Sequence, residues 1–158
     1  MNNKFDTIYK KLGKDLEIYF KRFSSLDASI ISERKNKQDR SIKQILGHMI
    51  DSASNNTHRI IHLQYGVSPL EFPNYATNGN NDRWISIQNY QDEDWELLLN
   101  LWRYIHLHLI YVIGNIDDQK LQNIWLGGDD ETVTLEEMVM DFPRHFYLHI
   151  QEIEELMR

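Results

Sequence analysis

The sequence predicts an all-α fold, a four-helix bundle. Apolar residues recur at helical spacing in four long stretches, and two of these stretches begin with a capping-box sequence. No stretch shows the sustained alternation of an amphipathic strand. A chain of 158 residues that is 41% hydrophobic is also long enough to bury a core. We therefore expect residues 1–158 to form a single domain in which four helices share that core.

The first helix is expected over roughly Lys4 to Ile31. Its apolar residues follow the i, i+3, i+4, i+7 spacing of one buried helix face, at Phe5, Ile8, Leu12, Leu16, Tyr19 and Phe23. The polar segment from Ser32 to Asp39 is expected to connect it to the second helix.

The second helix is expected to begin at Asp39 or Ser41. Ser41 and Gln44 have the spacing of a capping box. Several polar residues then recur along an edge beside the apolar face: His48, Asp51, Asn55, His58 and His62. His48 lies on the border of the buried face, where a side chain can reach into a cleft.

Residues 65–90 interrupt the helical pattern and predict a long loop between the second and third helices. The segment is rich in glycine, proline and asparagine, and connections of this length are often functional. It also carries Phe72, Tyr75 and Trp84. These aromatic residues could cover the open end of the bundle, or they could pin the loop to the core, because burial of large rings is favourable.

The third helix is expected over about Asp92 to Ile113, and the fourth begins at the second capping box, Thr134 to Glu137. Between them, residues 115–131 form a connector, with its tightest turn expected at residues 127–130. The short run of residues 132–135 is interpreted as the entry to the last helix rather than as a strand.

The last helix carries His145 and His149, which are four residues apart. On an α-helix this spacing places the second residue ~40° round and ~6 Å along from the first, so that both imidazoles project from one face. That face is the apolar one, where polar side chains need partners. A metal ion is one such partner, and hydrogen bonds within a metal-free core are the alternative.

His48 is a candidate third ligand, which would complete a three-nitrogen site with open coordination positions. Its competitors are His58, His62, His106 and His108. We assign His58 and His62 to the solvated face or to the loop junction, because they lie about three and four turns from His48. His106 and His108 are assigned to the surface of the bundle.

Asp51 and Asp141 each lie one helical turn from a proposed ligand. Either carboxylate could accept the free ring N–H of a ligating histidine, or could take a proton from bound water. For each residue the spacing favours the alternative, an ordinary surface carboxylate or a pair on the helix surface, because i,i+3 and i,i+4 spacing needs no other cause. Glu152, three residues after His149, is the weakest of these candidates.

Composition excludes several classes of function. The chain has no cysteine, so it offers neither thiolate ligands nor a cysteine nucleophile. Its net charge of −7, without a basic cluster, argues against nucleic-acid binding. We expect no signal peptide, no membrane span and a cytoplasmic location. The Glu-x-x-His pairs of di-iron bundles and the Gly-x-Ser-x-Gly turn of serine hydrolases are also absent from the sequence.

The run from Leu46 to Asn56 resembles the second helix of the DinB-like family of four-helix-bundle metalloenzymes. Four further segments and the C-terminal tail are also similar to that family: Phe72 to Tyr75, Trp84, Gln88 to Tyr90, Trp95 to Trp102, and the tail from Asp141 to Ile153. The resemblance extends from about Ser41 to the end of the chain. It implies a DinB-like bundle whose metal ligands are His48, His145 and His149. Members include thiol-dependent transferases and isomerases.

The sequence thus predicts a metal-dependent enzyme, either a hydrolase or a thiol-dependent transferase that acts on a small molecule. The expected cofactor is a divalent transition metal, with zinc or nickel favoured by imidazole ligands and iron or manganese as alternatives. Any low-molecular-weight thiol must come from outside, since the chain contains none. The competing interpretation is a non-catalytic interaction module with a structural metal or none. A homodimer is expected in either case.

Overall fold

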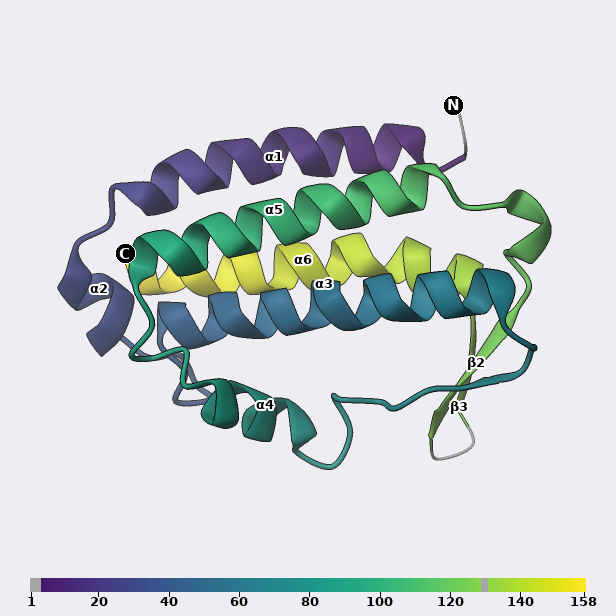
Figure 1. The fold of residues 1–158 in the computed structure, drawn as a ribbon. Helices are drawn as coiled ribbons and strands as arrows, with labels where there is room; N and C mark the ends of the chain where they lie inside the picture. The colour runs from purple at the N-terminus through teal and green to yellow at the C-terminus, as the bar shows by residue number, and fades with distance from the viewer. Residues whose placement is uncertain (1–3, 129–130) are drawn as a thin grey trace.

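The computed structural model describes residues 4–128 and 131–158. Four long helices lie side by side in it (Figure 1): α1 (Asp6–Ser24), α3 (Ile42–Tyr65), α5 (Trp95–Gly114) and α6 (Leu135–Met157). Shorter elements join them: the helices α2 (Ala28–Glu33) and α4 (Asn80–Gln88), the 3-10 turn η1 (Asp118–Lys120), and the strands β1 (Leu70–Glu71), β2 (Ile124–Gly128) and β3 (Glu131–Thr134). The predicted four-helix bundle is confirmed.

Both capping boxes form as predicted. The Ser41 hydroxyl accepts the backbone N–H of Gln44, while the Gln44 side chain accepts the N–H of Ser41. Thr134 and Glu137 make the same reciprocal pair at the start of α6. These caps set the first turn of the two helices that carry the predicted metal ligands.

The first predicted helix is interrupted, so its expected extent to Ile31 is wrong. α1 ends at Ser24, and α2 begins at Ala28 after an extended Asp27. The hydroxyls of Ser24 and Ser25 donate to the carbonyls of Lys21 and Arg22. Such side-chain hydrogen bonds compete with the backbone hydrogen bonds of a helix, and the spacing of apolar residues does not predict them.

The long helices do not simply alternate in direction. α3 and α5 run the same way along the bundle, while α1 and α6 run the opposite way (Figure 1). The chain must therefore return along the whole bundle between α3 and α5. Residues 66–94 make this crossover, and they include β1 and α4. The predicted long loop is thus a crossover connection.

A three-stranded sheet fixes the crossover to the segment before α6. β1 pairs parallel to β2, and β2 pairs antiparallel to β3. The sequence interpretation without strands is wrong here, because such short strands do not show a period. The predicted turn at residues 127–130 includes two residues, Asp129 and Asp130, that lie outside the described part of the chain.

The core lies between the four long helices and is mostly aliphatic and aromatic. Its largest fully buried side chains include Trp102, Phe5, Phe23, Phe146, Leu12 and Leu16. α5 is long and apolar enough to cross a membrane by length and composition. One face of α5 packs against α1 and α3 in the bundle. The expected absence of a membrane span stays a prediction.

Candidate metal centre

Three histidines from two helices converge inside the bundle. One ring nitrogen from each of His48, His145 and His149 lies within 4.8 Å of the other two. The Nε2 atoms of His145 and His149 are 3.1 Å apart. The ring centroid of His48 lies 5.4 Å from that of His145 and 4.7 Å from that of His149. The structure therefore brings together the three residues that the sequence singled out.

Helix geometry accounts for this convergence. His145 and His149 project from one face of α6, as i,i+4 residues do. Pro143 lies within α6, yet the helix is continuous from Leu135 to Met157. α6 packs beside α3, which supplies His48. The site thus depends on the packing of two helices far apart in the sequence.

The three imidazoles differ in what lies beside their Nδ1 atoms. His149 Nδ1 lies 2.9 Å from a Glu152 carboxylate oxygen, and His145 Nδ1 lies 3.4 Å from the Ser52 hydroxyl. His48 Nδ1 is buried and has no hydrogen-bond partner among the described residues. With its Nδ1 proton donated to Glu152, His149 presents a bare Nε2 lone pair toward His145.

Burial keeps two of these rings neutral. Burial, and then the neighbouring His149 and His145, lower the pKa of His48 to about 2. The pKa of His145 falls to about 3, again mainly through burial and then through His149. Neutral imidazoles have a lone pair available for a metal at neutral pH.

The donor set fits a divalent transition ion. Two imidazole nitrogens that each lie about 2.0–2.1 Å from one ion are about 3–3.4 Å apart, which matches the His145–His149 separation. Without a cation between them, two nitrogen lone pairs at this distance repel unless a ring proton lies between them. His48, His145 and His149 are the residues that could hold the ion.

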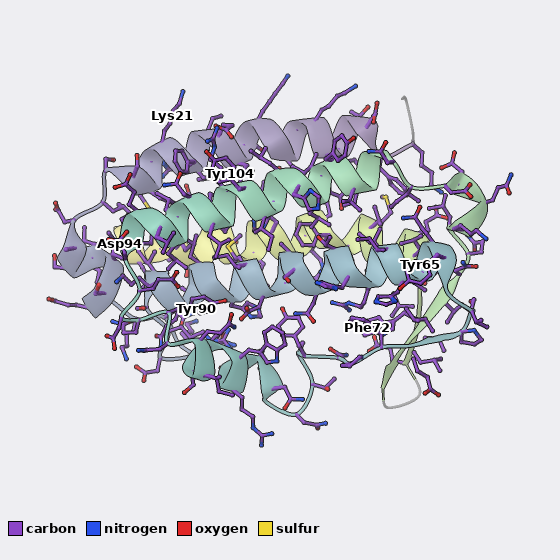
Figure 2. The ribbon with its side chains drawn as sticks, viewed as in Figure 1. Lys21, Tyr65, Phe72, Tyr90, Asp94 and Tyr104 are labelled. Carbon is purple, nitrogen blue, oxygen red and sulfur yellow. The ribbon has the colours of Figure 1, made fainter. Side chains whose placement is uncertain are left out.

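Asp51 lies in a buried hydrogen-bond network with the crossover. Its Oδ1 is 2.7 Å from the Tyr90 hydroxyl and 2.8 Å from Gln88 Nε2. Burial raises the pKa of Asp51, although both hydrogen bonds oppose that shift. Tyr90 lies between α3 and α4 (Figure 2), where its ring packs so tightly on Gly47 that a Cβ there would be 2.1 Å from it. Asp51 thus anchors the crossover next to His48.

Asp141 pairs with a neighbour on its own helix. Both of its oxygens accept hydrogen bonds from Arg144, at 2.6 and 2.9 Å. This guanidinium, and more weakly His145, hold the pKa of Asp141 below its usual range. The carboxylate in hydrogen-bond contact with a candidate ligand is instead Glu152, which the sequence ranked last. Its i,i+3 spacing from His149 was the available signal.

The remaining histidines lie apart from the cluster. His106 contradicts its assignment to the bundle surface: it is 1% exposed and packs against Trp102, Phe142 and Phe146. Its Nδ1 lies 2.7 Å from the Trp102 carbonyl oxygen, so it is a core residue. His58 is exposed, as predicted, and His108 is at the surface of α5. His62 contacts Tyr65 and Phe72 at the loop junction.

The crossover covers part of the histidine cluster. The Tyr75 ring centroid lies 6.1 Å from that of His48 and 5.5 Å from that of Trp84. Phe72 lies beside the C-terminal part of α3, below Tyr65 (Figure 2), and its carbonyl accepts the Trp125 indole N–H. These aromatic residues therefore hold the loop to the bundle: Tyr75 packs beside His48, and Phe72 joins the loop to the sheet. That they cover the open end of the bundle stays a prediction.

A cavity of about 490 Å³ opens beside the cluster. His145 lines it, together with residues of α3, the crossover, the β2–β3 pair (hereafter the hairpin) and α6 that include Ser52, Arg59, Tyr75, Trp125 and Asp141. The volume is that of a small-molecule site. Sequence analysis missed Arg59 and Ser52, although both lie at helical spacing from His48.

Known structures share this fold. One is YfiT from Bacillus subtilis, described as "a probable metal-dependent hydrolase with an unusual four-helix bundle topology". It matches with a TM-score of 0.81 and 18% identity over 99% of this chain and 87% of that one. The fold is therefore the DinB-like four-helix bundle, as predicted.

A second similar structure is the mycothiol-dependent maleylpyruvate isomerase, with a TM-score of 0.73 and 15% identity over 92% of this chain. The chain spans 58% of the isomerase's length. A histidine-to-alanine mutant of that isomerase has the same TM-score, with 14% identity. No protein-family model and no curated protein matches the sequence.

Proposed function

We propose that this chain is a metal-dependent enzyme whose divalent transition ion is held by His48, His145 and His149. The observation that carries the proposal is the convergence of three imidazoles beside a cavity of small-molecule size. Three protein ligands leave coordination positions open, as in catalytic rather than closed structural sites. Zinc or nickel suits the all-imidazole donor set best, with iron and manganese as the alternatives.

The reaction is hydrolysis or thiol transfer on a small molecule. A bound divalent ion supplies Lewis-acid chemistry, or lowers the pKa of a water or thiol. In the transfer case the thiol comes from outside, because the chain has no cysteine. The mycothiol dependence of the structurally similar isomerase supports a low-molecular-weight thiol as a partner.

The surrounding residues have separable tasks in this proposal. Glu152 orients the His149 ring, and Tyr75 excludes water above His48. Asp141 lines the cavity and, with its pKa lowered by Arg144, is ionised at neutral pH. It can therefore accept a proton released by a water or a thiol in the cavity. Asp51 positions the crossover through Tyr90.

Metal stoichiometry tests the proposal directly. Elemental analysis of protein purified without a metal-affinity tag should give about one transition ion per chain. His145→Ala should lose that ion, whereas His108→Ala, which changes a histidine on α5 away from the cluster, should retain it. Equal metal content in wild type and His145→Ala would contradict the proposal.

A non-catalytic module is the second candidate, and the exposed apolar residues of α5 favour it: Leu97, Leu101, Tyr104 and Tyr111. These residues also offer a face for the expected homodimer, which stays a prediction together with the cytoplasmic location. Chelation separates the two functions. A large fall in melting temperature on chelation, in a protein that shows no ester or thiol turnover in any assay, would favour the module.

A further inference from the structure

Arg59 is a buried cation that has no acidic partner among the described residues. Its side chain belongs to α3 and is 6% exposed. No carboxylate of the described residues forms a salt bridge with it. The other buried arginine, Arg40, has an acidic partner, because its Nη2 lies 2.6 Å from Asp82. An unpaired charge is costly to bury, so the environment of Arg59 calls for a negatively charged partner.

The guanidinium of Arg59 is held in place by two contacts that leave its outer edge free. Its plane lies over the Trp125 ring, with Cζ 4.2 Å from the ring centroid. Its Nε donates to the Asn55 carbonyl at 3.3 Å. Neither Nη group has a hydrogen-bond partner among the described residues, and neither is sealed from solvent as Arg40 Nε is. The Nη groups therefore reach the cavity that Arg59 lines.

Arg59 lies on the same face of α3 as the candidate metal ligand. His48, Ser52 and Arg59 are separated by four and seven residues, so that they follow one line along the helix. Eleven residues correspond to ~16 Å along α3, and the long arginine side chain can shorten that gap. Ser52, Arg59 and His145 line the same cavity, which joins the guanidinium to the metal centre.

The acidic residues around this cavity are already engaged or exposed. Glu137 accepts the Thr134 N–H and hydroxyl in the capping box, and Asp141 is bound by Arg144. Glu131, the third, is exposed at the start of β3. Burial lowers the pKa of Arg59 to about 10, which still leaves the guanidinium charged at neutral pH. The buried part of the cavity wall therefore carries a positive charge at Arg59.

We infer that Arg59 binds a carboxylate group of the substrate, whose reacting group lies at the three-histidine site. This inference rests on the proposed function and gives it a substrate class, the small carboxylic acids. A planar carboxylate matches the paired N–H donors of a guanidinium edge. Trp125 and Asn55 hold that edge in one orientation, which reduces the ordering cost of binding.

Glutarate is a suitable probe, and glutaramide is its uncharged counterpart. In the zinc-loaded protein, glutarate should shift the NMR signals of Arg59 Nε–H and Trp125 Nε1–H in a saturable way, whereas glutaramide should not. Equal shifts with both compounds, or none with glutarate, would overturn the inference. Because this measurement uses the unaltered chain, it does not depend on the folding of any variant.

Variants then locate the contact. Arg59→Met keeps the apolar stem and should weaken glutarate binding at least about tenfold in calorimetry, which corresponds to ~1.4 kcal/mol. Arg144→Met removes the exposed arginine of the same cavity wall and should change the affinity less than about twofold. Arg59→Lys, which keeps the charge but not the paired donors, should fall between them. Unchanged affinity in folded Arg59→Met would refute the carboxylate site.

Zinc content separates this inference from the proposed function. If the wild type binds no metal but glutarate still shifts the Arg59 signal, the metal-enzyme proposal fails and the carboxylate site stands. If one zinc binds per chain and glutarate does not shift the Arg59 signal, only the carboxylate site fails.

Discussion

Buried histidines occupy two regions of this bundle, and their surroundings differ. His106 packs among three aromatic rings, and its Nδ1 is bonded to the Trp102 carbonyl within the same helix. His48 and His149 are 5% exposed and face each other and His145 from two helices. At His48 a buried nitrogen remains without a partner among the described residues.

The difference teaches that burial alone does not distinguish a ligand from a core residue. His106 is the most deeply buried of these histidines, yet its surroundings already satisfy it. The three-histidine cluster instead brings one ring nitrogen of each residue within 4.8 Å of the other two, beside a cavity. Convergence of ring nitrogens from two helices is thus the feature that indicates a metal.

The largest expected effect is on thermal stability. Zinc at about a thousand times its Kd should stabilise the wild type by ~4 kcal/mol, which for a domain of this size is about 8–16 °C in Tm. His149→Ala should lose that gain, and His106→Leu should keep it. Thermal melts with and without zinc measure both. A zinc response that disappears in His106→Leu would break the comparison.

The second effect is the share of His106 in the pH dependence of stability, measured as a difference between the wild type and a His106 variant. Burial lowers its pKa from 6.5 to about 4, so the unfolded chain takes up this proton first as pH falls. Its contribution to stability is complete above pH 6.5 and declines as pH falls toward 4, by about 3 kcal/mol in all. Denaturant unfolding of the metal-free protein should show a smaller loss from about pH 7 to pH 4 in His106→Leu. Parallel curves for the two proteins would contradict this assignment.

The smallest expected effect is on zinc affinity, and it tests whether Glu152 orients the His149 ring. Glu152→Gln removes the charge beside His149 Nδ1 and should weaken zinc affinity about 10–100-fold, or ~1.4–2.7 kcal/mol. Glu155→Gln, which alters an exposed carboxylate one turn from Glu152, is the matched control and should leave the affinity unchanged. Competition with a chelator of known affinity measures both. Equal affinities in the two variants would show that Glu152 does not orient the ring.

The sequence predicted the parts of the fold that depend on local chemistry. The helices that follow Ser41 and Thr134 begin as predicted, because a capping box depends on only four consecutive residues. The i,i+4 pair on α6 was predictable for the same reason. His48 was a candidate from the border of an apolar face, and the family resemblance implied its role.

The errors arose where the answer depends on distant residues. His106 was assigned to the surface because its aromatic neighbours, Phe142 and Phe146, come from another helix. The hairpin was missed because β2 and β3 pair over only a few residues. Arg59 has no sequence signal of its own, because an arginine is unusual only when the fold buries it without a salt bridge, as it does here among the described residues.

The parallel pairing of β1 with β2 joins the return crossover to the segment that leads into α6. Asn123 and Asn74 reinforce it with bonds to the Leu63 and Gly127 carbonyls. We expect added length to be tolerated best near Gly79, where a Cβ would have no other atom within 4 Å. An insertion between residues 68 and 74 would instead disturb the strands before α6, the helix that carries two of the three imidazoles. Engineered extensions therefore belong near Gly79.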